Sequence, residues 1–136
     1  MATSNETTVH KVSYRSASPG IEKVKILQVL VNVVQNAKDA VMESTKKDKL
    51  IILKTTLVKD RIRIEILDNG IGILAKNMEK VFIYGFTTKP SGHGFGLHTS
   101  ALILNGLGGR IAIESEGLEK GSKFTVEIPS SQGFSL

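Results

Sequence analysis

The stretch from Glu22 to Ser44 restricts the fold most, because it reads as one long helix that is apolar around most of its circumference. At about 100° per residue, apolar side chains fill every direction except one stripe of about 80°. The apolar positions are Val24, Ile26, Leu27, Val29, Leu30, Val31, Val33, Val34, Ala37, Ala40 and Val41. A helix of this kind is buried. We therefore expect it to lie against a sheet in a single core, for which 136 residues suffice.

The stripe that remains on this helix is polar and carries Gln28, Asn32, Asn36 and Asp39. Buried amides and carboxylates are costly unless they have hydrogen-bond partners. Two interpretations follow from the residues alone. The stripe either bonds neighbouring loops or strands, or faces a polar ligand or a hydrated metal ion.

The rest of the chain alternates strand and helix patterns. Strands with one apolar face are expected at Leu50–Val58, Arg61–Asp68, Arg110–Ser115 and Lys123–Ile128, with a weaker candidate edge strand at Thr8–Tyr14. Helices are expected at Ala75–Val81 and Phe95–Leu104, and Ser16–Gly20 reads as a break. The order predicts an α/β (α+β) fold, a two-layer sandwich in which helices cover one face of a mixed or antiparallel sheet. We expect residues 21–129 to form the domain, between an N-terminal edge segment (1–20) and a C-terminal tail (130–136).

Composition excludes several classes of site. Lys and Arg number 18 against 13 Asp and Glu, and the resulting charge of +5 is spread out, which is not a nucleic-acid signature. The chain has no cysteine, which excludes disulfides and thiolate metal sites and favours the cytoplasm. Its apolar stretches are too short to span a membrane, and MATSNETTVH lacks the features of a signal peptide. We therefore expect no contact with nucleic acid or membrane.

The stretch Gly85–Leu97, GFTTKPSGHGFGL, is rich in glycine and runs into the second long helix. Successive backbone N–H groups of such a loop can converge on an anion, and the helix dipole favours negative charge there. Glycine spacing alone fits a mobile surface loop equally well. The stretch does not match the G-x-x-x-x-G-K-[ST] phosphate loop.

Four separated pieces decide between these interpretations. They are Asn32-x-x-x-Asn36, Asp68-Asn69-Gly70-Ile71-Gly72, Phe82-x-x-x-Phe86-Thr87-Thr88-Lys89 leading to Gly92-x-Gly94-x-Gly96-Leu97, and Gly121-Ser122-x-Phe124. In order, spacing and context they resemble the Bergerat-fold (GHKL) ATP-binding domain, most closely the catalytic domain of bacterial two-component sensor histidine kinases. The resemblance covers Glu22 to Pro129 and implies that the chain binds ATP and Mg²⁺.

The resemblance places the adenine base at Asp68. A carboxylate only accepts hydrogen bonds, so it suits the amino group of adenine. Gly70 and Gly72 would let the backbone pass close to the base, and Ser122 would support the same end through water. Ile73 belongs to the same expected binding site.

The resemblance also places the metal and the phosphates. Asn36 matches the Mg²⁺ ligand, and an amide oxygen is a hard neutral donor that suits this ion. Asn32 would lie near the outer phosphates or metal-bound water, and Asp39 stands where the family often has a basic residue. The expected catalytic residues are Asn32, Asn36 and Lys89. Further binding residues come from an aromatic box, a lid and a glycine cradle: Phe82, Phe86, Thr88, Lys89, Gly92, His93, Gly94, Phe95, Gly96 and Leu97.

Asn32 separates the subclasses of this family. Chaperone, gyrase and mismatch-repair relatives carry a glutamate there as a general base, whereas an asparagine cannot take a proton at neutral pH. Sensor histidine kinases carry asparagine, so the resemblance implies transfer of the γ-phosphoryl group to a histidine. The alternatives are a self-contained GHKL-type ATPase, a protein kinase of another subclass, and a nucleotide-free interaction module.

A histidine kinase also needs a helical hairpin that bears the acceptor histidine. His10, in THKVSY, has no acid after it and no heptad pattern around it, so we expect the fragment not to phosphorylate itself. The implied partners are the histidine-bearing dimerisation domain of the same full-length protein and a downstream response regulator. Other regions of that protein would carry any membrane anchor. We also expect Thr87–Gly94 to become ordered when nucleotide binds.

Overall fold

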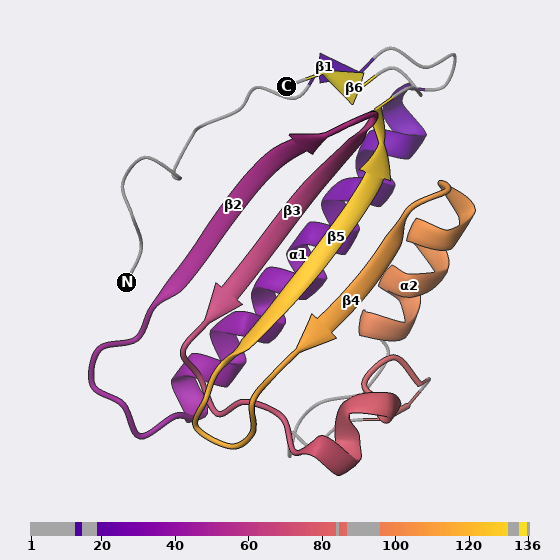
Figure 1. Ribbon diagram of the computed structural model, residues 1–136. Helices are drawn as coiled ribbons and strands as arrows, with labels where there is room; N and C mark the ends of the chain where they lie inside the picture. Colours follow the sequence, from indigo (N-terminus) through magenta and orange to yellow (C-terminus); the bar gives the residue numbers. More distant parts are fainter. Residues whose placement is uncertain (1–12, 15–18, 84, 87–95, 131–133, 136) are drawn as a thin grey trace.

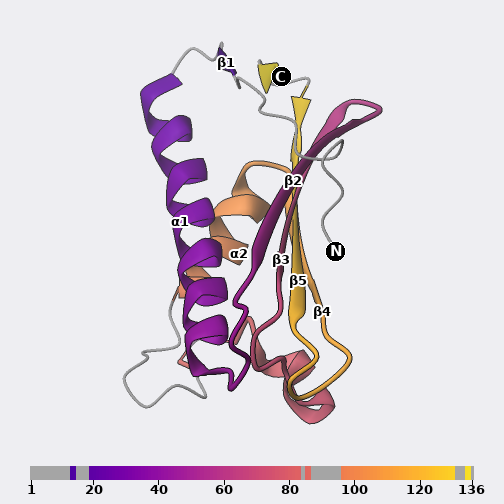
Figure 2. The same cartoon turned by 90° about the vertical axis from the view of Figure 1, so that its left-hand side faces the viewer.

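The computed structural model describes residues 13–14, 19–83, 85–86, 96–130 and 134–135. Its main body has two layers, a four-stranded sheet and a pair of helices on one face of that sheet (Figures 1 and 2). All strand pairs of this sheet are antiparallel, and the strand order is β2-β3-β5-β4. The two-layer α/β fold predicted from the sequence is thus confirmed, with an antiparallel rather than a mixed sheet.

The helices and strands lie close to the predicted ranges. They are β1 (Ser13–Tyr14), α1 (Pro19–Glu43), β2 (Ile51–Val58), β3 (Arg61–Asp68), the 3₁₀ helix η2 (Ala75–Lys80), α2 (Gly96–Gly106), β4 (Arg110–Glu114), β5 (Ser122–Pro129) and β6 (Phe134–Ser135). α1 begins before Glu22, inside the predicted break, because proline costs little in the first turn of a helix. β1 and β6 pair with each other in a separate two-stranded sheet, so Ser13–Tyr14 is not an edge strand of the main sheet.

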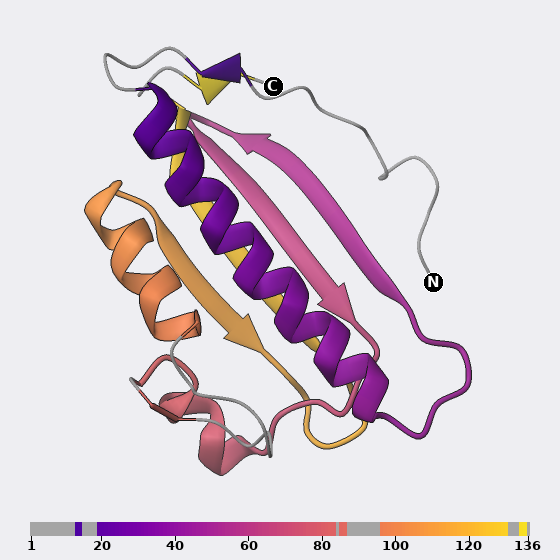
Figure 3. The ribbon, with the colours of Figure 1, turned by 180° about the vertical axis from the view of Figure 1, so that it is seen from behind.

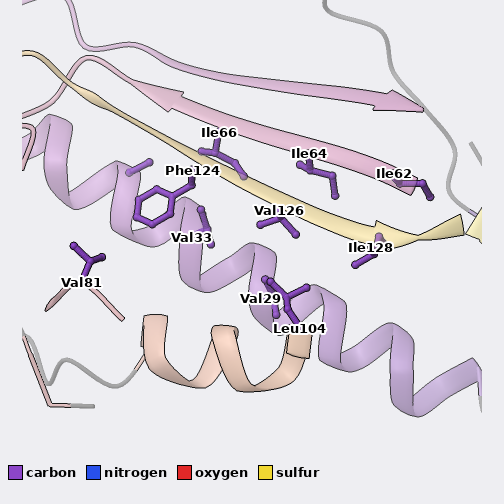
Figure 4. Packing of buried hydrophobic residues seen from close by; sticks show 11 residues of the cluster. Val29, Val33, Ile62, Ile64, Ile66, Val81, Leu104, Phe124, Val126 and Ile128 are labelled. Atoms are coloured by element: carbon purple, nitrogen blue, oxygen red, sulfur yellow. The ribbon is translucent and has the colours of Figure 1, made fainter. Parts of the chain in front are cut away.

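Alternation along the strands builds the core. Ile62, Ile64 and Ile66 of β3 are buried, while the residues between them point to the other face of the sheet. Figure 4 shows these side chains meeting Phe124, Val126 and Ile128 of β5 and Val29 and Val33 of α1, with Leu104 of α2 beside them. Strands of period two and helices of period 3.6 therefore place their apolar faces together, as the sequence indicates.

The helix α1 is not buried all round, which corrects the expectation from its composition. Val24, Leu27, Val31 and Met42 are each at least half exposed. Seen from behind, α1 runs over β3 and β5 and α2 lies beside β4, whereas most of the helix side of β2 stays uncovered (Figure 3). The two helices are too few to cover the whole sheet, so part of the apolar surface of α1 faces outward. Among the described residues, no helix has the length and apolarity that crossing a membrane requires.

Candidate functional site

Asp68 is the last residue of β3, on the sheet face that the helices cover. Only 9% of its surface is exposed. Its Oδ1 accepts a 2.8 Å hydrogen bond from the backbone N–H of Gly70, and its Oδ2 accepts a 2.7 Å bond from the Ser122 hydroxyl. Ser122 lies directly opposite Asp68 in the β3–β5 register. The carboxylate is therefore held in a fixed orientation at the end of the sheet.

The turn after Asp68 needs glycine because two backbones approach it closely. A Cβ on Gly70 would lie 2.4 Å from the carbonyl carbon of Ala40 in α1, and the N–H of Ile71 donates to the Ala40 carbonyl at 3.1 Å. Gly72 has a φ of +70°, and a Cβ there would lie 2.0 Å from the Gly117 carbonyl oxygen. The glycines thus set the distance between the turn, α1 and the β4–β5 loop.

A clamp that the sequence did not reveal holds the same turn from the other side. The Asn69 side chain accepts from the Leu50 N–H at 2.9 Å and donates to the Asp48 carbonyl at 2.6 Å. The Lys46 ammonium donates to the carbonyls of Asn69 and Glu119, at 3.0 and 2.8 Å. The residues between α1 and β2 therefore fix the turn that carries Asp68. The sequence marks Asn69 only as a turn residue, and these contacts are visible only in the fold.

The C-terminal end of α1 is capped by a lysine that follows it in the chain. The Lys49 ammonium donates to the carbonyls of Val41, Ser44 and Lys46 at distances of 2.7 to 2.9 Å. Lys46, which also follows the helix, instead serves the clamp. The Val41 carbonyl lies in the last turn of α1, where carbonyl groups have no partner within the helix, and Ser44 and Lys46 directly follow that turn.

The polar stripe of α1 connects this turn to α2. Asn32 Nδ2 donates to the Gly96 carbonyl and to the Ser100 hydroxyl, both at 3.1 Å. Asn36 is half-buried one turn further along, and Ala40, which touches the turn of Asp68, follows after one more turn. Each step of four residues is about 6 Å along the helix axis. The expected phosphate, metal and base residues therefore follow one another along α1.

The other two residues of the stripe take a smaller part. Gln28 is exposed, and Asp39 is half-buried and accepts a 3.1 Å hydrogen bond from Gln35 on the same helix. Part of the stripe thus bonds neighbouring elements, and part turns to solvent. The contacts of Asn32 confirm the first interpretation for that residue, whereas a polar ligand or hydrated metal ion beside the stripe stays a prediction.

The expected aromatic box packs into the core at one of its two positions. Phe82 is half-buried and meets the Phe124 ring edge-to-face, with centroids 6.4 Å apart. Its carbonyl oxygen lies 3.1 Å from Nδ1 of His98 in α2. Phe86 is half-buried, and its N–H donates to the Ile83 carbonyl. Core packing of Phe82 and a role beside a ligand are compatible, since one ring can serve both.

The remaining expected residues divide between the core and the part of the chain that is not described. Ile73 and Leu97 are half-buried against the core, and the Ile73 N–H donates to the Ser115 hydroxyl at 3.0 Å. Gly96 is the first residue of α2. Thr88, Lys89, Gly92, His93, Gly94 and Phe95 lie outside the described residues, as does the stretch Thr87–Gly94 that we expect nucleotide to order.

The sequence of this chain matches one protein family. Its description is "Histidine kinase-, DNA gyrase B-, and HSP90-like ATPase", and it matches residues 21–132. The chain belongs to this family. The matched range contains the turn of Asp68, the stripe of α1 and the start of α2.

Relatives of this ATPase-family domain are sensor proteins. The sensor protein FixL of Bradyrhizobium diazoefficiens is 34% identical over 110 residues, which are 81% of this chain and 21% of FixL. The sensor protein CitS of Halalkalibacterium halodurans is 36% identical over 108 residues, which are 79% of this chain and 20% of CitS. The chain thus spans about a fifth of the length of these curated relatives.

Solved structures with the same fold come from histidine kinases. The nucleotide-free catalytic domain of histidine kinase ThkA is 33% identical, with a TM-score of 0.65 over 79% of this chain and 67% of that one. The mycobacterial sensor histidine kinase MprB, 19% identical, has a TM-score of 0.68 over 78% of this chain and 70% of that one, which shows the shared fold alone. The domain is therefore of the type that forms the catalytic ATP-binding part of sensor histidine kinases.

Proposed function

We propose that this domain binds ATP with Mg²⁺ and presents the γ-phosphoryl group to a histidine on a separate acceptor domain. The observation that carries the proposal is the line of groups along α1. The fixed carboxylate of Asp68 lies at one end, Asn36 in the middle, and Asn32 with the start of α2 at the other. A ligand with a hydrogen-bonding base at one end and phosphates at the other matches this order.

The donor set fits both parts of the ligand. Each oxygen of Asp68 accepts one hydrogen bond from the protein, and a carboxylate has about four acceptor sites, so it can accept another from an adenine amino group. The amide oxygen of Asn36 is a hard donor on a half-buried side chain and would hold Mg²⁺ together with the phosphates. Bound Mg²⁺ would offset phosphate charge during transfer.

Asn32 favours a kinase over a hydrolase. Its carboxamide cannot accept a proton at neutral pH, and its Nδ2 is already bonded to the first turn of α2. An imidazole nucleophile has its own lone pair and needs no such base, whereas water does. The acceptor would be a histidine-bearing dimerisation domain, and a response regulator would receive the phosphoryl group next. We place the domain in the cytoplasm, where ATP is available.

The first experiment is an ATP titration of the domain by calorimetry, with and without Mg²⁺. We expect binding in both conditions, tighter with Mg²⁺. The second adds a cognate acceptor hairpin and measures phosphohistidine. No ATP binding would refute the proposal. Fast steady-state phosphate release without an acceptor would favour the alternative of a self-contained ATPase, and binding without phosphohistidine formation would count against the kinase.

A further inference from the structure

Ser100 lies in the second turn of α2, outside every motif that the sequence singled out. Among the described residues it is the one buried polar side chain with an exposed fraction of 0%. A buried hydroxyl is costly unless it is hydrogen-bonded. The hydrogen bonds of the Ser100 hydroxyl therefore indicate the role of this residue.

The Ser100 hydroxyl uses both its donor and an acceptor site. It donates to the Gly96 carbonyl at 2.9 Å and accepts from Asn32 Nδ2 at 3.1 Å. Asn32 Nδ2 also donates to the Gly96 carbonyl at 3.1 Å. The three groups close a triangle that joins α1 to the first turn of α2, and both N–H bonds of the Asn32 amide lie within it.

Helix stability does not account for a serine at this position. A serine that bonds back to the carbonyl four residues earlier slightly destabilises and often bends a helix. Alanine is also the better helix former. What the hydroxyl adds is the contact to Asn32.

We propose that Ser100 is a positioning residue for Asn32. A carboxamide is planar, so holding Nδ2 against α2 fixes Oδ1 on its other branch. Oδ1 is an acceptor, which suits a water molecule bound to Mg²⁺ or a hydroxyl-type donor at the reacting end of the ligand. Without Ser100, Asn32 keeps the Gly96 carbonyl as its partner but loses the second bond that sets its orientation. This inference rests on the proposed binding of Mg²⁺ and ATP.

The test compares Ser100→Ala with Thr99→Ala, which removes a half-buried hydroxyl from the neighbouring position of the same helix. The first readout needs no nucleotide and is the exchange with water of the Asn32 side-chain N–H protons, measured by NMR. We expect exchange about two- to tenfold faster in Ser100→Ala, from the loss of one hydrogen bond. Thr99→Ala should exchange like the wild type. An unchanged exchange rate in Ser100→Ala would overturn the inference.

The second readout is the ratio of the ATP dissociation constants without and with Mg²⁺. In Ser100→Ala we expect this ratio to fall about two- to tenfold, while the dissociation constant without Mg²⁺ changes less than about twofold. In an Asn32→Ala background, Ser100→Ala should leave the ratio unchanged, because the hydroxyl acts through Asn32. Equal weakening in both conditions would show a structural role only and would contradict us. A wild type that binds no ATP would refute the proposed function, and proton exchange would still decide whether Ser100 holds Asn32.

Discussion

Leu57 and Ile62 face each other across the β2–β3 pair, on the same side of the sheet, and their burial is opposite. Ile62 is fully buried, whereas Leu57 is 56% exposed. The helix α1 covers β3 and leaves most of the helix side of β2 open (Figure 3). Leu53, four residues before Leu57 and on the same face, is 48% exposed. The covered area therefore ends between two neighbouring strands.

This boundary predicts a large difference between two truncations in adjacent strands. Ile62→Ala should lower the free energy of unfolding by about 2–5 kcal/mol, because it removes buried methyl groups and leaves a cavity. Leu57→Ala should cost less than about 1 kcal/mol, because its side chain is already in contact with water. Urea denaturation of both variants measures the difference. Equal costs would mean that a further element covers β2 in solution.

The sequence predicted the sheet better than it predicted the surroundings of α1. The alternation of Arg61–Asp68 depends on one buried face and locates β3 to the residue. The periodicity of α1 records which side chains are apolar, but not how many elements surround them. Val24 and Val31, at 62% and 63% exposed, look the same in sequence as the fully buried Val29 and Val33. Such differences follow from the number of neighbouring elements, which a single sequence does not show.

The candidate site also contains residues whose positions could be predicted from the sequence and residues whose roles could not. Asp68, Gly70 and Ser122 lie in a short motif and at paired strand ends, so their positions could be predicted. The contacts of Lys46 and Ser100 join segments that are 23 and 68 residues apart in the chain. These two residues carry no local pattern, because a lysine after a helix and a serine within one are ordinary. Their roles depend on tertiary structure.

Gly70→Ala should destabilise the domain and weaken nucleotide binding together. The new Cβ would lie 2.4 to 2.7 Å from backbone atoms of Ala40 and Val41, which cannot move without shifting α1. Overpacking of this kind costs about 1–3 kcal/mol or more. The matched control is Gly106→Ala in α2, where a Cβ would meet nothing within 4 Å. The control should be neutral or stabilise by about 0.5–1 kcal/mol. Thermal melts separate the two, and a neutral Gly70→Ala would contradict the close approach.

Glu127 predicts a pH-dependent contribution to stability on the open face of the sheet. It is buried, and its carboxylate accepts from Arg63 Nε at 2.8 Å and from Arg110 Nε at 2.9 Å, with Arg61 Nε at 3.6 Å. The hydrogen bond from Arg63, opposed by desolvation and aided by Arg110, lowers the pKa of Glu127 below its usual 4.5. The stabilisation is thus complete above that value and is lost as pH falls through the lowered pKa.

Glu127→Gln should therefore cost about 1–3 kcal/mol near neutral pH, because it leaves three arginines without their charged partner. The cost should shrink below pH 4.5, where the wild-type carboxyl itself becomes protonated. Glu114→Gln is the control, since the Glu114 side chain is 70% exposed in its pair with Lys123. A surface pair of this kind contributes about 0–1 kcal/mol. Urea denaturation at several pH values tests both variants, and a cost that does not vary with pH would contradict the assignment.

Asp68→Asn tests the proposed contact with the adenine base. Asparagine keeps one acceptor oxygen for Gly70 or Ser122, so we expect the variant to fold. Its amide group would meet the adenine amino group donor to donor, and loss of a hydrogen bond to a charged group weakens binding about ten- to hundredfold. Asp60→Asn, in the exposed turn at the other end of β3, is the matched control and should bind ATP like the wild type. Calorimetric titration gives both dissociation constants.

Base selectivity makes this test independent of folding effects. GTP has a carbonyl where ATP has the amino group, so wild type should prefer ATP and Asp68→Asn should lose most of that preference. Ser122→Ala keeps the carboxylate but removes the donor that orients it at 2.7 Å. It should weaken ATP binding only a few-fold and keep the preference for adenine, because the acceptor itself remains. If Asp68→Asn kept the wild-type preference for ATP over GTP, Asp68 would not be the group that reads the base.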